Sequence, residues 1–190
     1  EIVTMTATGT IRETYAQARG RACQLAHALK ASGIEIGDRV ATFMWNGHRH
    51  IEAYHAVPSM GAVLHTLNIR LGPDDLEYII NHAGDRIILA DADLLAALEP
   101  LAGQLPTVEK IVVCSDNPWS SSLPNTVDYE DFIAGHGEDY EWPIIDENSP
   151  LGLCYTSGTT GKPKGVMYTH RSTYLHTMAI AMTDTMNLSA

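Results

Sequence analysis

Apolar positions along the chain follow two spacings that alternate from one segment to the next. In residues 14–33 they recur every three and four positions, which is the spacing of one face of an α-helix. Residues 40–45 instead form a short, mostly apolar run between turn residues, which is typical of a strand buried on both faces of a sheet. The two patterns go on alternating as far as residue 115, so the sequence predicts helices that alternate with buried strands.

Turn and capping residues set the bounds of the expected elements. Residues 1–14 predict a hairpin that turns at Gly9, Thr14 is the expected cap of the first helix, and Gly33 is expected to end it. The remaining strands are expected at 40–45, 62–68, 86–91, 110–115, 151–155 and 166–168. The remaining helices are expected at 49–60, 73–83, 94–101 and 170–183, with Gly84 ending the helix at 73–83. Residues 116–148 are expected to form an irregular connection with one short helix near 128–134.

This order of elements predicts an α/β fold. Right-handed crossovers between parallel strands place helices on both faces, so we expect a doubly wound, mostly parallel sheet flanked by helices. A chain of 190 residues is long enough for one domain with a sizeable core. The chain begins with Glu1 and ends at Ala190 directly after a helical pattern, so we expect it to be an incomplete N-terminal domain of a longer protein.

The composition of the chain indicates which class of binding partner and which cellular location to expect. The formal net charge of -11 at pH 7 argues against a nucleic-acid partner, which usually requires a basic face. Acidic residues gather between Asp91 and Pro150, where Lys110 is the only Lys or Arg, and we interpret this stretch as a solvated acidic surface. No apolar run is long enough to cross a bilayer, and the three cysteines are scattered. These observations predict a cytoplasmic protein without a transmembrane segment.

Several histidines invite a metal hypothesis that their spacing does not favour. His48, His50 and His55 cluster, but they lack the spacing of a zinc site, and positions two apart do not share a helical face. We expect them at the surface or at an interface. His65 and His82 fall within apolar patterns, so we expect them to be hydrogen-bonded histidines of the core or of a sheet edge.

The segment "LCYTSGTTGKPKGV", residues 153–166, concentrates the chemistry that binds phosphate. Backbone amides in a glycine-bent turn form an anion-binding nest, and hydroxyl and ammonium groups add further donors. The glycines are Gly158, Gly161 and Gly165, the hydroxyl residues are Thr156, Ser157, Thr159 and Thr160, and the lysines are Lys162 and Lys164. The spacing is that of neither a Walker A loop nor a dinucleotide-binding turn. From composition alone, a polar hairpin without a ligand remains an alternative.

The same segment resembles the phosphate-loop signature of the AMP-forming acid–CoA ligase and adenylating enzyme superfamily (ANL). The match covers each signature position from Thr156 to Lys164 and the glycine that follows. Upstream, "EAYHAVP" and "GAVLHTLNIRL" within Val40–Asp91 resemble the medium- and long-chain fatty acyl-CoA synthetase branch, and "YTHR" at 168–171 fits as well.

The resemblance implies a two-step reaction. A carboxylic acid attacks the α-phosphate of ATP to give acyl-AMP and pyrophosphate, and coenzyme A then displaces AMP to give a thioester. The residues that it implies for binding the ATP phosphates are Thr156, Ser157, Gly158, Thr159, Thr160, Gly161 and Lys164. The resemblance also implies Thr156 as a magnesium ligand, whereas Lys162 occupies a variable position and is expected to face solvent. ATP, Mg²⁺, coenzyme A and a medium- or long-chain fatty acid are thus the expected small molecules.

Other hypotheses remain open on the sequence. The chain is expected to be the N-terminal part of an AMP-binding (adenylation) domain, with the C-terminal half of the enzyme absent, and to be inactive alone. An aryl-acid CoA ligase and a peptide-synthetase adenylation domain share the loop, and a truncated, non-catalytic nucleotide-binding module belongs to another class. The resemblance is compatible with peripheral membrane contact and with a homodimer.

Overall fold

The computed structural model describes residues 1–6, 9–156, 161–182 and 186. The helices are α1 (Tyr15–Ala31), α2 (His48–Ser59), α3 (Pro73–Ala83), α4 (Leu95–Leu98), α5 (Tyr129–Ile133) and α6 (His170–Ala181). The strands are β1 (Ile2–Thr6), β2 (Gly9–Glu13), β3 (Arg39–Phe43), β4 (Val63–Thr66), β5 (Asp85–Asp91), β6 (Lys110–Cys114), β7 (Thr126–Asp128), β8 (Pro150–Thr156) and β9 (Lys164–Thr169).

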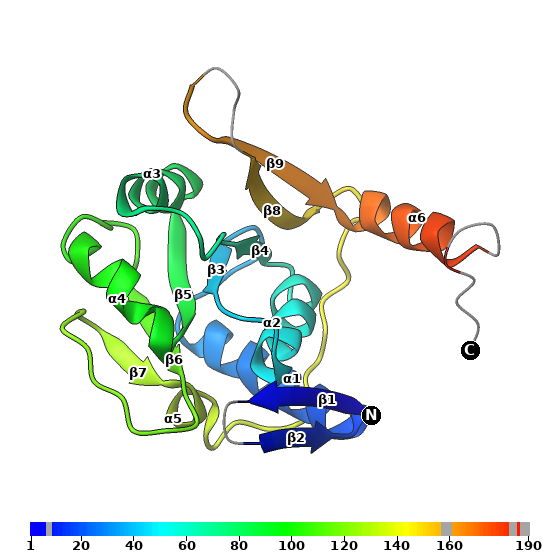
Figure 1. The fold of residues 1–190 in the computed structure, drawn as a ribbon. Helices are drawn as coiled ribbons and strands as arrows, with labels where there is room; N and C mark the ends of the chain where they lie inside the picture. The colour runs from blue at the N-terminus through cyan, green and yellow to red at the C-terminus, as the bar shows by residue number, and fades with distance from the viewer. Residues whose placement is uncertain (7–8, 157–160, 183–185, 187–190) are drawn as a thin grey trace.

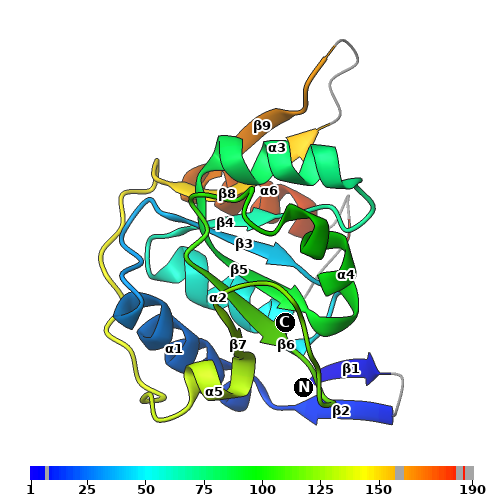
Figure 2. The same ribbon diagram turned by 90° about the vertical axis from the view of Figure 1, so that its left-hand side faces the viewer.

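Seven strands form one sheet in the order β7-β6-β5-β3-β4-β8-β9 (Figure 2). Each neighbouring pair is parallel except β8 and β9, which are antiparallel. The strand order reverses at β3, which lies between β4 and β5. The predicted doubly wound, mostly parallel α/β fold is confirmed.

Helices cover both faces of the sheet, and each face has its own apolar core. In Figure 1, α3 and α4 lie on one side of β5 and β6, and α1 and α2 lie on the other. One core joins the sheet to α1, α2 and α5, and includes Leu25 and Val57. The other joins the sheet to α3 and α4, and includes Phe43 and Ile79. Strands buried on both faces explain why their sequences are continuously apolar.

The predicted caps of two helices are confirmed. Thr14 accepts a hydrogen bond from the amide of Gln17, and the Gln17 side chain bonds back to the Thr14 amide, so α1 begins with a capping box. Gly84 ends α3 in the left-handed conformation with φ of 69°. Pro73 begins this helix, where its missing amide costs no intrahelical bond.

Two local predictions were wrong. Instead of one helix over 94–101, the chain forms the short α4 between two 3₁₀ turns, Ala92–Leu94 and Glu99–Leu101. Pro100 has no amide to continue α-helical bonding, which favours the tighter turn. The segment 116–148 also contains β7, whose three residues pair with β6 at the sheet edge.

The hairpin of β8 and β9 and the helix α6 extend from the rest of the molecule (Figure 1). Thr169 caps the start of α6, where its side chain accepts a hydrogen bond from the Ser172 amide, and α6 contains no buried residue. Among the described residues, no helix combines the length and the apolar character that crossing a bilayer requires.

Candidate functional site

The segment that is predicted to bind phosphate begins in β8 and ends in β9, which pair as a hairpin. Tyr155 pairs with Gly165 and Thr156 pairs with Lys164, so the two ends of the loop are held side by side by strand pairing. The strand pairing therefore fixes the distance between the two ends of the loop.

The structure brings together the two ends of the predicted site. Thr156 is the last residue of β8 and Lys164 the first residue of β9, and both are exposed. Gly161 is also described and exposed. Four further predicted residues lie outside the described residues: Ser157, Gly158, Thr159 and Thr160.

Lys162 contacts α3. Its Nζ lies 4.7 Å from the centre of the Tyr78 ring, a cation–π contact, while the residue as a whole stays exposed. This agrees with the expectation that Lys162 faces solvent. Residues of α3, among them Asp74 and His82, line a shallow depression with Lys162 and Pro163.

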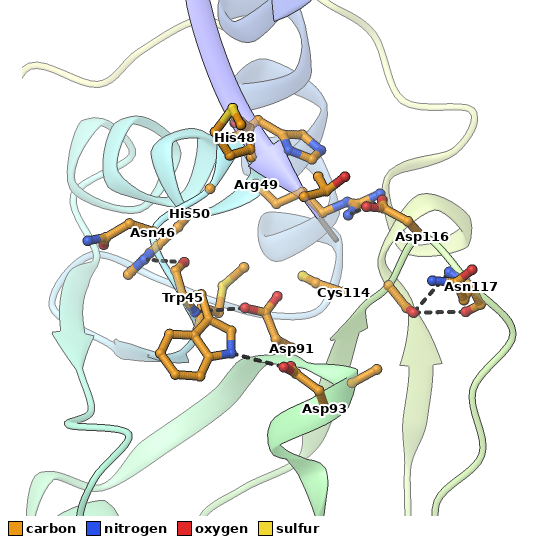
Figure 3. A pocket seen from close by; sticks show the side chains of 17 residues that line it. Trp45, Asn46, His48, Arg49, His50, Asp91, Asp93, Cys114, Asp116 and Asn117 are labelled. Atoms are coloured by element: carbon orange, nitrogen blue, oxygen red, sulfur yellow. Dashed lines mark hydrogen bonds and ion pairs between the residues drawn. The ribbon is translucent and has the colours of Figure 1, made fainter. Parts of the chain in front are cut away.

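A second hollow, a cavity of about 400 Å³, lies at the carboxyl ends of β3, β5 and β6. Figure 3 shows the side chains that line it. The cavity lies where the strand order reverses, which is where ligands bind in open α/β sheets. Its described lining includes Trp45, Asp91, Asp93 and Arg49 and no residue of the β8–β9 loop. The sequence analysis did not predict this cavity. Polar residues that directly follow the predicted parallel strands could have indicated it, because the carboxyl ends of adjacent parallel strands lie at the same edge of the sheet.

Hydrogen bonds from Trp45 organise two carboxylates of the cavity. The Trp45 amide donates to Asp91 at 2.7 Å and the indole Nε1 donates to Asp93 at 3.0 Å (Figure 3). Burial raises the pKa of Asp91 to about 6, although the Trp45 amide opposes the rise. Asp91 therefore titrates nearer to neutrality than an ordinary aspartate.

Arg49 carries the positive charge of the cavity wall. It pairs with Asp116 at 2.8 Å and with Glu130 at 3.0 Å. Burial opposes its charged form, but the two carboxylates outweigh burial and raise the pKa of Arg49. Its charge is thus already balanced within the chain.

The expectation that His48, His50 and His55 lie at the surface or at an interface is met by His55, which is exposed. It was wrong for a surface position of His48 and His50, which are buried within the chain at 8% and 7% exposure, respectively. His50 Nδ1 lies 3.2 Å from the Trp45 carbonyl oxygen and Nε2 lies 3.0 Å from Thr42 Oγ1. Burial lowers the pKa of both histidines. The helical spacing of apolar residues did not reveal the burial of these two histidines, because other elements of the fold cover both sides of the first turn of α2.

Metal-binding potential is limited in the part of the chain that the structure describes. It contains no group of three or more His, Cys, Asp or Glu side chains arranged to hold an ion. The exposed hydroxyl of Thr156 offers one oxygen of the kind that Mg²⁺ accepts when phosphates supply most other ligands.

Comparisons with known proteins relate the whole chain to one family. A family model described as "AMP-binding enzyme" matches residues 2–190. The medium-chain-fatty-acid–CoA ligase of Ectopseudomonas oleovorans is 45% identical over 193 residues, covering 100% of this chain and 35% of that protein. The long-chain-fatty-acid–CoA ligase of Thermus thermophilus is 44% identical over 190 residues, covering 100% of this chain and 34% of that protein.

A solved structure shows the same fold. The crystal structure of the anthranilate CoA ligase AuaEII in complex with anthranoyl-AMP matches with a TM-score of 0.83 and 24% identity, over 94% of this chain and 33% of that one. The chain thus spans about one third of the length of the relatives that it matches.

Proposed function

Because the chain belongs to the family of AMP-binding enzymes, we propose that it contributes the phosphate loop of an AMP-forming fatty acid–CoA ligase. Two relatives at 45% and 44% identity, which are named as medium- and long-chain-fatty-acid–CoA ligases, support the fatty acid as substrate. They extend well beyond the region matched here, so the complete activity is proposed for the longer protein that carries this chain.

The proposed reaction has two displacement steps. A carboxylate oxygen of the acid forms a bond to the α-phosphorus of ATP, and the bond from that phosphorus to the bridging oxygen breaks, which releases pyrophosphate. The sulfur of coenzyme A then forms a bond to the acyl carbon, the bond from that carbon to the AMP oxygen breaks, and the thiol proton is released. Negative charge grows on pyrophosphate in the first step, so fixed donors around it lower the barrier.

One observation carries this proposal. The signature loop connects β8 to β9, and Thr156 and Lys164 at the two ends of the loop are paired with each other in the hairpin. This pairing supports simultaneous contact of a hydroxyl and an ammonium group with one polyphosphate. The residues proposed to contact the β- and γ-phosphates are Thr156, Ser157, Gly158, Thr159, Thr160, Gly161 and Lys164.

Thr156 is also the proposed protein ligand of Mg²⁺. Bound together with ATP, the ion would supply neutralisation of phosphate charge. Coenzyme A is the proposed second co-substrate. A cytoplasmic location, a homodimer and peripheral membrane contact stay predictions from the sequence.

An acid-dependent exchange assay tests the function. With the gene's full-length polypeptide, octanoate or palmitate is expected to drive exchange of labelled pyrophosphate into ATP. Benzoate and a panel of amino acids are tested separately in the same assay, so that the class of acid that drives exchange can be identified. Exchange with an amino acid alone would contradict the fatty-acid proposal, and exchange with none of these acids would contradict the ligase proposal.

The two loop lysines provide a matched pair for testing the phosphate contact. Lys164→Ala is expected to slow acyl-adenylate formation about 10- to 100-fold, because it removes one charge-assisted hydrogen bond. Lys162→Ala removes the same charge from a side chain that lies over Tyr78, and it is expected to change the rate less than about threefold. Single-turnover formation of acyl-AMP measures both. Equal losses in the two variants would remove the assigned role of Lys164.

A further inference from the structure

A buried acid–histidine pair lies in the layer between the sheet and α3. His65 of β4 and Asp85 of β5 are both fully buried, and His65 Nδ1 lies 2.8 Å from Asp85 Oδ2 and 2.9 Å from Oδ1. Burial raises the pKa of Asp85, and the contact with His65 opposes that rise. The function proposed above uses neither residue.

The other side of the imidazole faces the end of β8. The His65 and Tyr155 ring centres are 5.2 Å apart at an interplanar angle of 45°. Nε2 of His65 is buried without a hydrogen-bond partner among the described residues. Asp85 therefore fixes the ring at one nitrogen, and packing against Tyr155 occupies the remaining side.

Tyr155 is held from two further directions. Its hydroxyl lies 2.6 Å from Nδ1 of His82, which is on α3. Its ring also crosses Gly165 on β9: a Cβ at Gly165 would lie 3.2 Å from Tyr155 Cζ and 3.4 Å from its hydroxyl oxygen. A Cβ at Gly165 would be in tight contact with the ring, which would have to move by a few tenths of an ångström, so the glycine favours the present position of the ring.

The contacts of Tyr155 reach both ends of the phosphate loop. Tyr155 directly precedes Thr156, and its strand partner Gly165 directly follows Lys164. A shift of the Tyr155 ring would therefore move the base of the loop on both strands. The β8–β9 hairpin needs such support, because every residue of β9 is exposed or only partly buried.

We propose that His65 and Asp85 are positioning residues for the phosphate loop, and that they act by fixing Tyr155 against Gly165. Asp85 orients the His65 imidazole, the imidazole and His82 fix the tyrosine, and the tyrosine sets the direction in which Thr156 and Lys164 leave the hairpin. The catalytic consequence of this inference depends on the function proposed above, whereas its structural consequence does not.

A pair of tyrosine variants separates positioning from general stability. Tyr155→Phe and Tyr129→Phe each remove one hydroxyl that bonds a titratable side chain, since Tyr129 donates to Glu52 in the core on the opposite face of the sheet. Hydrogen exchange of the β9 amides and the separate values of KM for ATP and kcat are measured in the full-length polypeptide. Loss of the Tyr155–His82 hydrogen bond is expected to change β9 exchange and KM for ATP about three- to tenfold.

The expected result differs between the two variants. Tyr155→Phe accelerates exchange in β9 and raises KM for ATP while KM for the acid stays nearly constant. Tyr129→Phe lowers the unfolding midpoint but leaves β9 exchange and KM for ATP near their original values. Unchanged β9 exchange in Tyr155→Phe, or an equal change in Tyr129→Phe, overturns the positioning role whether or not the protein has ligase activity. Absence of activity in the unmodified protein counts against the proposed function alone.

A second set of variants tests the acid–histidine pair itself. His65→Phe keeps a ring beside Tyr155 but leaves Asp85 as an unpaired buried carboxylate, which can prevent folding. His65→Phe combined with Asp85→Asn removes that charge, and it is expected to accelerate β9 exchange as Tyr155→Phe does. Gly165→Ala is expected to do the same by displacing the ring. Native exchange rates in the double variant would overturn the positioning role of His65 and Asp85, and native rates in Gly165→Ala would overturn the role of the Tyr155–Gly165 contact.

Discussion

At the scale of single residues, the environment of a carboxylate decides its charge. Asp85 and Asp91 stand at opposite ends of β5. Asp85 faces an imidazole, while Asp91 accepts an amide hydrogen bond from Trp45 and lies beside the acidic Asp93. Both positions are aspartate in the sequence, and only the fold gives the two carboxylates different partners.

Asp91 should make stability fall as the pH rises. Its pKa of about 6 in the folded chain exceeds the value of about 3.9 for an unfolded aspartate, so the folded state holds the proton more tightly. The contribution is fully present below about pH 4 and is lost as the pH rises through about 6. Asp91→Asn keeps an acceptor for Trp45 and removes the charge. Its urea midpoint is expected to exceed that of the unmodified chain at pH 7 and to match it near pH 4; the same difference at both pH values would contradict this assignment.

At the scale of elements, most helices and strands follow from local signals. The N-cap of α1 and the glycine that ends α3 were readable because each satisfies the free backbone groups of its own helix. The length of α4 was misread, because one proline within an apolar pattern changes the type of turn. β7 was missed because three half-buried residues carry too little periodicity, and pairing with β6 alone makes them a strand.

Gly84 offers a test of this local control. At φ of 69°, and with a Cβ position 2.8 Å from Arg39 Nη2, it is a poor site for any side chain. Gly84→Ala is expected to lower the free energy of unfolding by about 1–2 kcal/mol. Gly137→Ala is the control, because Gly137 has no positive φ and no close neighbour, and it should change that energy by less than about 0.5 kcal/mol. Chemical denaturation compares the two, and equal effects would refute the role of the left-handed cap.

At the scale of the molecule, burial is unevenly distributed. The strands β3, β5 and β6 are enclosed between two apolar cores, whereas β9 and α6 contain no buried residue. Large apolar side chains on these two elements are exposed; they are Val166, Met167, Tyr168, Tyr174, Leu175 and Met178. The helical pattern of α6 was correctly predicted, but the pattern does not say which surface, if any, its apolar residues contact.

This asymmetry predicts a gradient of local stability. In the 190-residue chain, amides of α6 are expected to exchange hydrogen at least about a hundredfold faster than those of β3 and β5, because few buried contacts oppose local opening. Exchange followed by mass spectrometry measures the gradient, and α1, a helix with eight buried residues, is the matched comparison. Equal protection of α6 and α1 would show that the exposed face is covered in solution.

The sequence by itself determined the alternation of helices and strands and the caps, and it located the segment that is predicted to bind phosphate. These features depend on interactions between residues that are close in the chain, and such interactions produce a periodic pattern or a motif in the amino-acid sequence. The tertiary structure decided the burial of His48 and His50, the cavity at the carboxyl ends of the strands, and the meeting of His65, Asp85, Tyr155 and His82. Those contacts join residues far apart in the chain, and their distances depend on how the strands are ordered in the sheet.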